Sequence, residues 1–377
     1  MNIIDYVMNT KSTFDRLPLN SVDSLVLCQL SYIKFENVID ERNISCSASD
    51  KRRIRDFYKS EFFDKMFCDS ISDEKNMMLF AAAAASPRFR DIIIKNISVD
   101  FNPKIEKQFA AMTFVIDKNT EYVAFRGTDG TLIGWKEDFN MAFTDVVPSQ
   151  SQAADYIDRN YGKKMLFAQP KRIYIGGHSK GGNLAEYGAL MSKPEIHKNI
   201  IEIFSHDGPG FRQDVLLKLE DVKKRDGLKI NKQVPQSSLI GMLLQSQVEY
   251  RVVKSTSTGL MQHSAFSWQI DGNDFVYKEN LAYGGEFFDK TMQDWLVMID
   301  DDERKLFVDS VYEILTKNNI NTYADVKNLS PKQIKAIYDD FSEADDEKKK
   351  VTAMVIKSLI KIAFKTALNV NDDQKNK

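Results

Sequence analysis

The chain reads R-I-Y-I-G-G-H-S-K-G-G over residues 172–182, an apolar run followed by a glycine-rich turn. The run has the β-branched and aromatic residues of a buried strand, and residues 177–181 match the pattern G-x-S-x-G. A serine in that pattern stands on a sharp strand-to-helix turn, where only small neighbours avoid a clash. We therefore predict that Ser179 is a nucleophile at the end of a strand, with a helix beginning directly after it. A glycine-rich turn with a spectator serine is the alternative.

The amino-acid composition argues against several classes of protein. The 377 residues carry a formal net charge of −2, whereas a nucleic-acid-binding protein is usually basic. The start of the chain shows no secretory signal, and no apolar run is long enough to span a bilayer. The three cysteines form no C-x-x-C pair, and no two of the four histidines have metal-ligand spacing. We therefore expect a cytoplasmic protein with reduced thiols, no integral membrane segment, no nucleic-acid partner, no metal and no cofactor.

The hydrophobic pattern divides the chain into four regions. Residues 1–100 are expected to be largely helical and to pack on the core, while strands and helices alternate over residues 101–284. This alternation predicts an α/β protein with a mixed, mostly parallel sheet covered by helices. Residues 285–370 are expected to form a helical C-terminal extension, and residues 371–377 a polar tail. The expected strands are 109–116, 121–126, 172–176, 199–204, 248–253 and 266–270, the first two as a hairpin.

The expected helices lie before, within and after the alternating region. They are 24–30, 75–85, 149–167, 182–190, 286–296, 301–315 and 351–368. The last is amphipathic, with Lys357, Lys361 and Lys365 on one face. That face either makes a weak contact with an anionic membrane surface or is the solvated side of a packed helix. The slightly acidic composition favours the solvated side.

A serine nucleophile needs a base, and the chain offers four histidines. His178 neighbours the nucleophile, so its side chain diverges from the serine hydroxyl, and His197 lies near the end of the elbow helix, away from the strand ends. His206 follows an earlier strand. His263 lies in a late loop, where the base is found in the chain order nucleophile, acid, histidine. We therefore assign His263 as the catalytic base; an ordinary loop histidine is the alternative.

The acid that orients the base should lie between Ser179 and His263. Asp207 follows the strand 199–204 in the tight loop H-D-G-P-G, so its carboxylate is expected at the C-terminal edge of the sheet. We choose Asp207, and a turn aspartate without a catalytic role is the alternative. The other carboxylates considered are surface-helix, turn or strand residues: Asp214, Glu220, Asp221, Asp226 and Glu249.

An oxyanion hole needs two N–H donors. One is the backbone N–H of Lys180, the residue after the nucleophile. The other usually comes from a loop after an earlier strand, and the glycine-containing loop F-R-G-T-D-G at 125–130 fits that place. We assign the backbone N–H of Thr128, with its hydroxyl as support. Arg126 and Asp129 either belong to this site or only brace the loop with an ion pair.

These segments together resemble the class 3 lipase-like α/β-hydrolases, in which a strand ending in an F-R-G-T-type loop precedes a G-H-S-x-G-G elbow. The closer resemblance is to the bacterial Mbeg-like family, a lipase-like domain of unknown function. The resemblance implies an α/β-hydrolase fold and a catalytic triad, without naming a substrate. The matching stretches cover most of residues 1–290: 23–25 with 29–32, 86–89, 108–111, 123–129, 134–141, 176–183, 207–211, and 262–263 with 266–268.

The sequence departs from the class 3 lipases at the triad acid. Those proteins usually carry the acid in a D-x-V-P-like segment after the next strand, and the similar segment here, 234–241, has no carboxylate. Either the acid has moved one strand earlier, to Asp207, or the site is a serine–histidine dyad steadied by Ser238. Trp135 and Phe139 are candidates to line or cover the cleft, but we expect them in the core.

The sequence therefore predicts a serine hydrolase, an esterase or lipase-like enzyme that cleaves a small acyl-ester or lipid-like substrate through an acyl-enzyme. The rival is a catalytically silent α/β-hydrolase-fold module that binds or regulates a partner, which the missing carboxylate and the C-terminal helices favour. The same triad serves hydrolysis and acyl transfer, and nothing in the sequence selects an acyl length, an alcohol or an oligomeric state.

Overall fold

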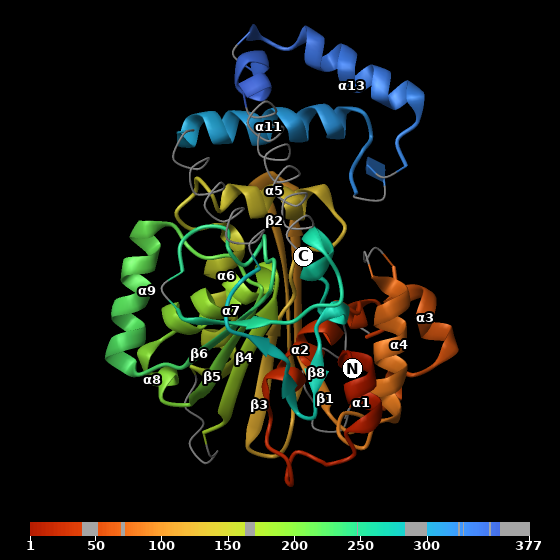
Figure 1. The fold of residues 1–377 in the computed structure, drawn as a ribbon, viewed down its shortest axis with the longest axis vertical. Helices are drawn as coiled ribbons and strands as arrows, with labels where there is room; N and C mark the ends of the chain where they lie inside the picture. The colour runs from red at the N-terminus through yellow and green to blue at the C-terminus, as the bar shows by residue number, and fades with distance from the viewer. Residues whose placement is uncertain are drawn as a thin grey trace, which may run out of the picture.

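The computed structural model describes residues 1–39, 52–68, 72–162, 170–246, 248–282, 300–322, 325–326, 328–346 and 348–354. These residues build one eight-stranded sheet with the order β1-β2-β3-β4-β5-β6-β7-β10, and a two-stranded ribbon of β8 and β9 (Figure 1). The strands are β1 (Ile93–Asn102), β2 (Lys107–Val115), β3 (Thr120–Phe125), β4 (Arg172–His178), β5 (Ile200–His206), β6 (Ile230–Pro235), β7 (Tyr250–Val253), β8 (Ile270–Asp271), β9 (Asp274–Phe275) and β10 (Tyr277–Lys278).

The middle of the large sheet is parallel. Strands β3 to β7 run in the same direction, while β1, β2 and β3 form an antiparallel meander at one edge and β10 pairs antiparallel with β7 at the other. Parallel neighbours bring the carboxyl ends of β4, β5 and β6 to one edge, where loops carry functional groups in α/β folds. The predicted α/β-hydrolase fold with a mixed, mostly parallel sheet is confirmed.

Helices cover both faces of the sheet (Figure 1). Side chains of β2 and β3 alternate between two cores, so that Phe109 and Val123 face one layer of helices while Phe114 and Tyr122 face the other. The first layer consists of α6 (Pro148–Tyr161), α7 (Lys180–Met191), α8 (Pro194–His197) and α9 (Gln213–Asp226). The second consists of α1 (Ile3–Asn9), α2 (Ser21–Leu30), α3 (Ser60–Met66) and α4 (Asp73–Ala85).

A buried ion pair joins α2 to the turn that follows α4. Asn20 caps α2 by accepting from the N–H groups of Val22 and Asp23, and Asp23 returns the bond to the N–H of Asn20. The same Asp23 carboxylate accepts from Arg88, at 2.8 Å from Nε and 2.5 Å from Nη2, and both side chains are fully buried. Two of the stretches that carry the family resemblance, 23–25 and 86–89, therefore meet in space.

Three segments differ from the sequence-based expectation. Strand β1 lies at the end of a region expected to be largely helical, and β6 was not expected because polar residues interrupt its apolar pattern. The strand expected at 266–270 is instead a 3₁₀ turn, Ala265–Ser267, followed by the short β8. The hydroxyl of Ser267 donates to the carbonyl of Ser264 at 2.8 Å, a local bond that competes with sheet pairing.

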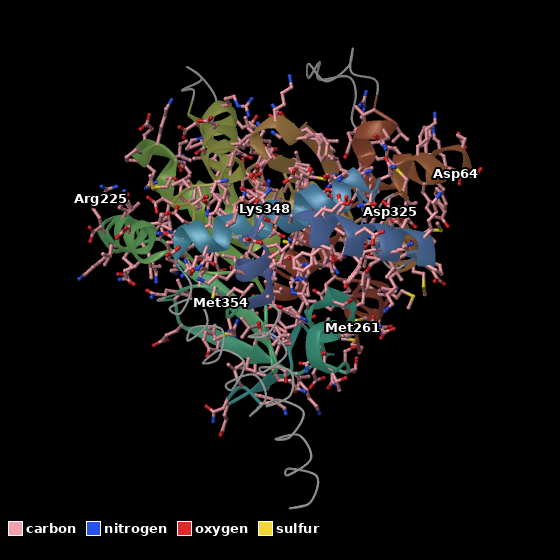
Figure 2. The ribbon with its side chains drawn as sticks, turned by 90° about the horizontal axis from the view of Figure 1, so that it is seen from above. Asp64, Arg225, Met261, Asp325, Lys348 and Met354 are labelled. Atoms are coloured by element: carbon pink, nitrogen blue, oxygen red, sulfur yellow. The ribbon has the colours of Figure 1, made fainter. Side chains whose placement is uncertain are left out.

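The C-terminal helices lie beyond one end of the sheet. Helix α5 (Leu132–Asn140) caps that end, α11 (Asp301–Lys317) lies across α5, and α13 (Pro331–Glu343) lies beyond α11 (Figures 1 and 2). The helix predicted at 301–315 is therefore confirmed. Four expected segments lie wholly or mostly outside the described residues: the helix at 286–296, residues 163–167 at the end of the helix seen as α6, most of the helix at 351–368 with its three lysines, and the tail 371–377. Among the helices described, none has the length and apolarity needed to cross a bilayer.

Candidate active site

Ser179 stands in a strained backbone conformation at the junction of β4 and α7. Its φ of 60° and ψ of −136° lie in a region that costs a non-glycine residue about 1–3 kcal/mol. The N–H of Ser179 donates to the carbonyl of His206 at 3.0 Å, and the N–H of Gly182 donates to the carbonyl of Ser179 at 2.8 Å. A Cβ on Gly177 would clash with the backbone of Gly181, so the turn requires glycine there. This is the geometry of the predicted nucleophile elbow.

Asp207 occupies the equivalent place on the neighbouring strand. His178 and His206 are register partners at the ends of β4 and β5, so Ser179 and Asp207 are each the next residue along adjacent parallel strands. Asp207 also has a positive φ, 52°, and its N–H donates to the carbonyl of Gln233 on β6 at 2.8 Å. Because neighbouring strands lie about 4.8 Å apart, the two backbones are close together at the carboxyl edge of the sheet.

The Asp207 carboxylate is completely buried and is bonded at both oxygens. Oδ2 lies 2.6 Å from Nδ1 of His263, the last residue of a 3₁₀ turn, Gly259–His263. Oδ1 accepts from the hydroxyl of Ser238 and from the N–H of Gly241 at 3.1 Å. An ionised carboxylate only accepts, so Nδ1 of His263 carries the hydrogen and Nε2 keeps its lone pair for a proton.

The loop after β6 therefore donates hydrogen bonds to the Asp207 carboxylate. Ser238 and Gly241 belong to the segment 234–241, where the class 3 lipases usually have their acid, and both donate to Asp207 from one strand away. A Cβ on Gly241 would meet the Asp207 carboxylate and the Ser238 hydroxyl, so a larger residue would block this approach. The geometry favours the alternative in which the acid lies one strand earlier, and it places Ser238 on the carboxylate.

His178 has a structural role that the sequence did not reveal. Its ring stacks on His263 with 4.6 Å between centroids and 29° between planes, and its Nε2 donates to the carbonyl of His263 at 2.8 Å. Burial, and next the positive charge that His263 would carry, lower the pKa of His178 to about 3. His178 thus stays neutral and supports the base from the residue before Ser179.

The loop after β3 approaches the nucleophile closely. A Cβ on Gly127 would lie 3.1 Å from Cβ of Ser179 and 2.6 Å from the carbonyl of His178. The hydroxyl of Thr128, the next residue, donates to Oδ2 of Asp138 on α5. Within the described residues, the backbone N–H groups of Thr128 and Lys180 have no hydrogen-bond partner, so both are available to an oxyanion.

The side chain of Lys180 points into the protein and supports the elbow from below. Its Nζ is 2.7 Å from Oε1 of Gln108, 2.9 Å from the Gln108 carbonyl and 3.0 Å from Oε2 of Glu137. Lys180 and Glu137 are both buried, and the Glu137 carboxylate also accepts from Gln108 N–H and from Ser149. The charges are therefore paired and fully bonded, as a buried ion pair requires.

The remaining candidates lie at some distance from the reacting groups. Arg126 pairs with Glu36 at 2.8 Å, and Asp129 pairs with Lys34 at 3.8 Å, so each braces the loop against the N-terminal region instead of bonding the other. Elsewhere, His197 Nδ1 bonds Asp226 at 2.5 Å, and His206 Nε2 bonds the hydroxyl of Ser24 at 2.8 Å. The expectation that Phe139 is a core residue is wrong: its side chain is 53% exposed on α5.

No hydrogen bond joins the hydroxyl of Ser179 to His263 in the part of the chain that the structure describes. Both residues are partly exposed, and catalytic hydrogen bonds of unliganded sites are often long and shorten when substrate binds. Two neighbouring contacts keep Ser179 and His263 close to each other: Asp207, which bonds His263, lies beside Ser179, and His178, which precedes Ser179, stacks on His263. The described part of the chain contains no group of three or more side chains that could hold a metal ion.

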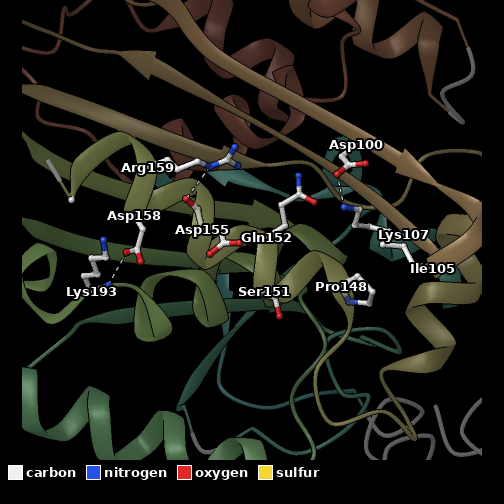
Figure 3. A pocket seen from close by; sticks show the side chains of 11 residues that line it. Asp100, Ile105, Lys107, Pro148, Ser151, Gln152, Asp155, Asp158, Arg159 and Lys193 are labelled. Carbon is white, nitrogen blue, oxygen red and sulfur yellow. Dashed lines mark hydrogen bonds and ion pairs between the residues drawn. The ribbon is translucent and has the colours of Figure 1, made fainter.

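A surface hollow of about 870 Å³ lies away from this site, along α6 (Figure 3). Charged side chains line it and bond one another or the nearby backbone: Lys107 pairs with Asp100, Arg159 donates to the carbonyl of Asp155, and Asp158 accepts from the N–H of Lys193. None of the predicted site residues lines this hollow. The predicted site residues are thus gathered at the strand ends and not in this hollow.

A family model named Mbeg1-like matches residues 83–313, more than half of the chain. The chain belongs to the Mbeg1-like family. The match includes the elbow, Asp207, His263 and most of α11. No curated protein matches this Mbeg1-like chain.

The Mbeg1-like chain also has distant structural neighbours that are named as lipases. One is a lipase from Rhizopus microsporus var. chinensis, with 14% identity and a TM-score of 0.33, covering 48% of this chain and 64% of that lipase. Lipase II from Rhizopus niveus has 18% identity and a TM-score of 0.32, covering 54% and 77%. The Rhizomucor miehei lipase propeptide complex has 12% identity and a TM-score of 0.30, covering 62% and 67%.

Proposed function

We propose that this Mbeg1-like protein is a serine hydrolase that cleaves acyl esters through Ser179, His263 and Asp207. One observation carries the proposal: His263 is bonded through Nδ1, at 2.6 Å, to a buried carboxylate whose backbone lies beside that of a strained serine. A scaffold gains nothing from a positive φ at Ser179, which costs free energy. A nucleophile does gain from it, because the turn presents the hydroxyl at a helix N-terminus.

The reaction follows from the roles of these groups. Oγ of Ser179 attacks the ester carbonyl while Nε2 of His263 takes the hydroxyl proton, and the carbonyl π electrons move to oxygen. The tetrahedral intermediate collapses by breaking the bond to the alcohol, which leaves with the proton from Nε2. Water then attacks the acyl-enzyme by the same steps, giving the carboxylic acid and free Ser179. Asp207 keeps the Nδ1 hydrogen in place and stabilises the imidazolium.

The negative oxygen of each intermediate would be bound by the backbone N–H groups of Lys180 and Thr128. The side chains of both residues are fixed by hydrogen bonds, since Lys180 bonds Glu137 and Thr128 bonds Asp138. Donors fixed before the reaction need no reorganisation, and losing one typically costs about 3–4 kcal/mol of transition-state stabilisation. This arrangement supports acyl transfer as the chemistry of the site.

An acyl chain is the part of the substrate that the surroundings fit best. Met261, two residues before His263, is 69% exposed, and Phe139, the residue after Asp138, is 53% exposed. Contiguous exposed apolar surface with a polar rim is typical of sites that bind apolar ligands, and Met261 and Phe139 are candidates for such a surface. We propose a small acyl ester or a lipid-like ester as substrate.

The test is hydrolysis of p-nitrophenyl esters from acetate to palmitate by the wild type and by Ser179→Ala. We expect the wild type to hydrolyse the esters, and the acyl length with the highest rate indicates the size of the acyl site. The variant should show neither an initial burst of p-nitrophenol nor steady turnover. A variant with unchanged circular dichroism and melting temperature serves as the proof that only the nucleophile was removed. Absence of wild-type hydrolysis on every ester would favour the alternative, a catalytically silent module.

A further inference from the structure

Helix α5 connects two regions that are far apart in the sequence. Three consecutive residues on it face three different parts of the protein: Lys136 faces α11, Glu137 bonds Lys180 below the elbow, and Asp138 bonds Thr128 in the loop beside Ser179. One turn of helix therefore contacts the C-terminal segment and both candidate oxyanion donors. A displacement of α5 would move the groups that hold these donors.

The described C-terminal segment, residues 301–322, contacts α5 at both ends and in the middle. At the start of the helix, Leu132 N–H donates to the carbonyl of Asn321 at 2.8 Å, and Thr131 forms a bridge with Thr322. Just beyond its end, the carbonyl of Ala142 accepts from Arg304 at 3.0 Å. Figure 1 shows α11 lying across α5 on the side away from the sheet.

Lys136 makes the central contact. Its ammonium lies 2.7 Å from Asp309 on α11, 2.8 Å from Glu106 on the core, and 4.6 Å from the centre of the Tyr312 ring. The side chain is only 8% exposed. Burial alone would lower the pKa of Lys136, but the bonds with Asp309 and Glu106 outweigh it and raise the pKa, so the charge is retained.

We propose that Lys136 is a positioning residue for the loop after β3, which carries Thr128. Through Lys136, residues 301–322 hold α5 in place, and α5 in turn holds Thr128. The family match supports this assignment, because it extends to residue 313 and so includes most of α11 as part of the same unit. The catalytic consequence rests on the proposed function, whereas the mechanical coupling does not. The two can be measured separately on the full chain.

The experiment is hydrogen–deuterium exchange of wild type, Lys136→Met, the conservative Lys136→Arg and the control Lys317→Met. Lys317 pairs with Asp340 between α11 and α13, is exposed, and does not contact α5. We expect about tenfold faster exchange over residues 127–140 in K136M, with residues 172–191 unchanged, because the variant loses the two ion pairs that join α5 to Asp309 and to Glu106. K136R should restore wild-type exchange, and K317M should leave it unaltered.

Equal exchange of residues 127–140 in wild type and K136M, or an equal rise in K317M, would overturn the proposal. If K136M unfolds as a whole, the exchange of residues 127–140 is measured instead in Asp309→Asn, in which Lys136 keeps its Glu106 partner. Faster exchange in that variant supports the proposal, and unchanged exchange overturns it. The rate of labelling by a fluorophosphonate gives the catalytic readout: about tenfold slower in K136M and restored in K136R. A wild type that is not labelled would refute the proposed function, while the exchange result would still decide the coupling.

Discussion

At the scale of single residues, the site depends on how Asp207 is held. Its carboxylate accepts from His263 at one oxygen and from Ser238 and Gly241 at the other, and its backbone has a positive φ. Asparagine tolerates that backbone region better than most residues. Asp207→Asn therefore removes the charge and changes the hydrogen bonding to Nδ1 without forcing the turn to change.

We predict that Asp207→Asn lowers kcat for ester hydrolysis about 10⁴-fold, because an amide can impose the wrong histidine tautomer and cannot stabilise the imidazolium. Ser238→Ala, which removes only one bond to the carboxylate, should lower kcat about tenfold. Steady-state kinetics with both variants measures the difference. Wild-type kcat in Asp207→Asn would mean that His263 is oriented by another group.

A second residue-scale prediction concerns Asp138, whose side chain is partly exposed. Burial raises the pKa of Asp138 from 3.8 to about 6, against the opposing effect of Lys180. A carboxyl with a raised folded-state pKa holds its proton more tightly when folded, so its contribution to stability is largest at low pH and is lost between pH 4 and 6. The melting temperature of Asp138→Asn relative to wild type should therefore rise as pH increases from 4 to 7. A difference independent of pH would contradict the pKa shift.

At the scale of secondary-structure elements, the ends of β4 and β5 carry two buried histidines side by side. His178 and His206 are register partners, and burial lowers the pKa of each to about 3. In the unfolded chain both titrate near 6.5, so between pH 6.5 and 3 the unfolded state binds more protons. The sign is therefore that stability falls as the pH is lowered through this range.

We predict that each of these histidines removes about 2 kcal/mol from the free energy of unfolding between pH 7 and pH 5. His206→Gln should abolish one of the two contributions, so that the variant loses about 2 kcal/mol less than wild type over this range. Urea unfolding at the two pH values measures both quantities. Equal pH dependence in variant and wild type would show that folding does not lower the pKa of His206.

The same elements show what the sequence can and cannot predict. The elbow could be predicted because the strand, Ser179 and the glycines are contiguous in the sequence, and the expected strand and helix are found as β4 and α7. Asp207 and His263 were chosen from chain order and strand ends, and the structure bonds them across 56 residues. Lys180 with Glu137, 43 residues apart, had no local signal, because a charged residue in a helix usually faces solvent. The contact of Asp138 with Thr128 was missed for the same reason, whereas that of His178, at the end of β4, is with a loop 85 residues later.

At the scale of the whole molecule, the described C-terminal part divides into two sections. Residues 301–322 contact the body through Arg212 with Asp301, Lys136 with Asp309, and the fully buried Ile320. Helix α13 has no buried residue among those described, and its contacts are with α11. These contacts place α11 with the body and so argue against a boundary near 285, while Val351 packs on α11 from beyond residue 322.

We predict that a chain ending at residue 322, which loses the packing of Val351 on α11 but keeps the contacts with the body, melts close to the wild-type temperature. A chain ending at residue 299 should melt about 5–10 °C lower, because it loses these ion pairs and apolar contacts. Differential scanning calorimetry of the two truncated chains and the full chain measures the shifts. Equal melting temperatures for both truncations would place α11 outside the cooperative unit.

The central claim, that Ser179 is an activated nucleophile, is tested most directly by a fluorophosphonate probe followed by peptide mass spectrometry. The serine oxygen would displace fluoride from phosphorus, so the account predicts one adduct on Ser179 in wild type, none in Ser179→Ala, and slower labelling in Asp207→Asn. A folded wild type that remains unlabelled, or a Ser179→Ala variant labelled equally, would contradict the account.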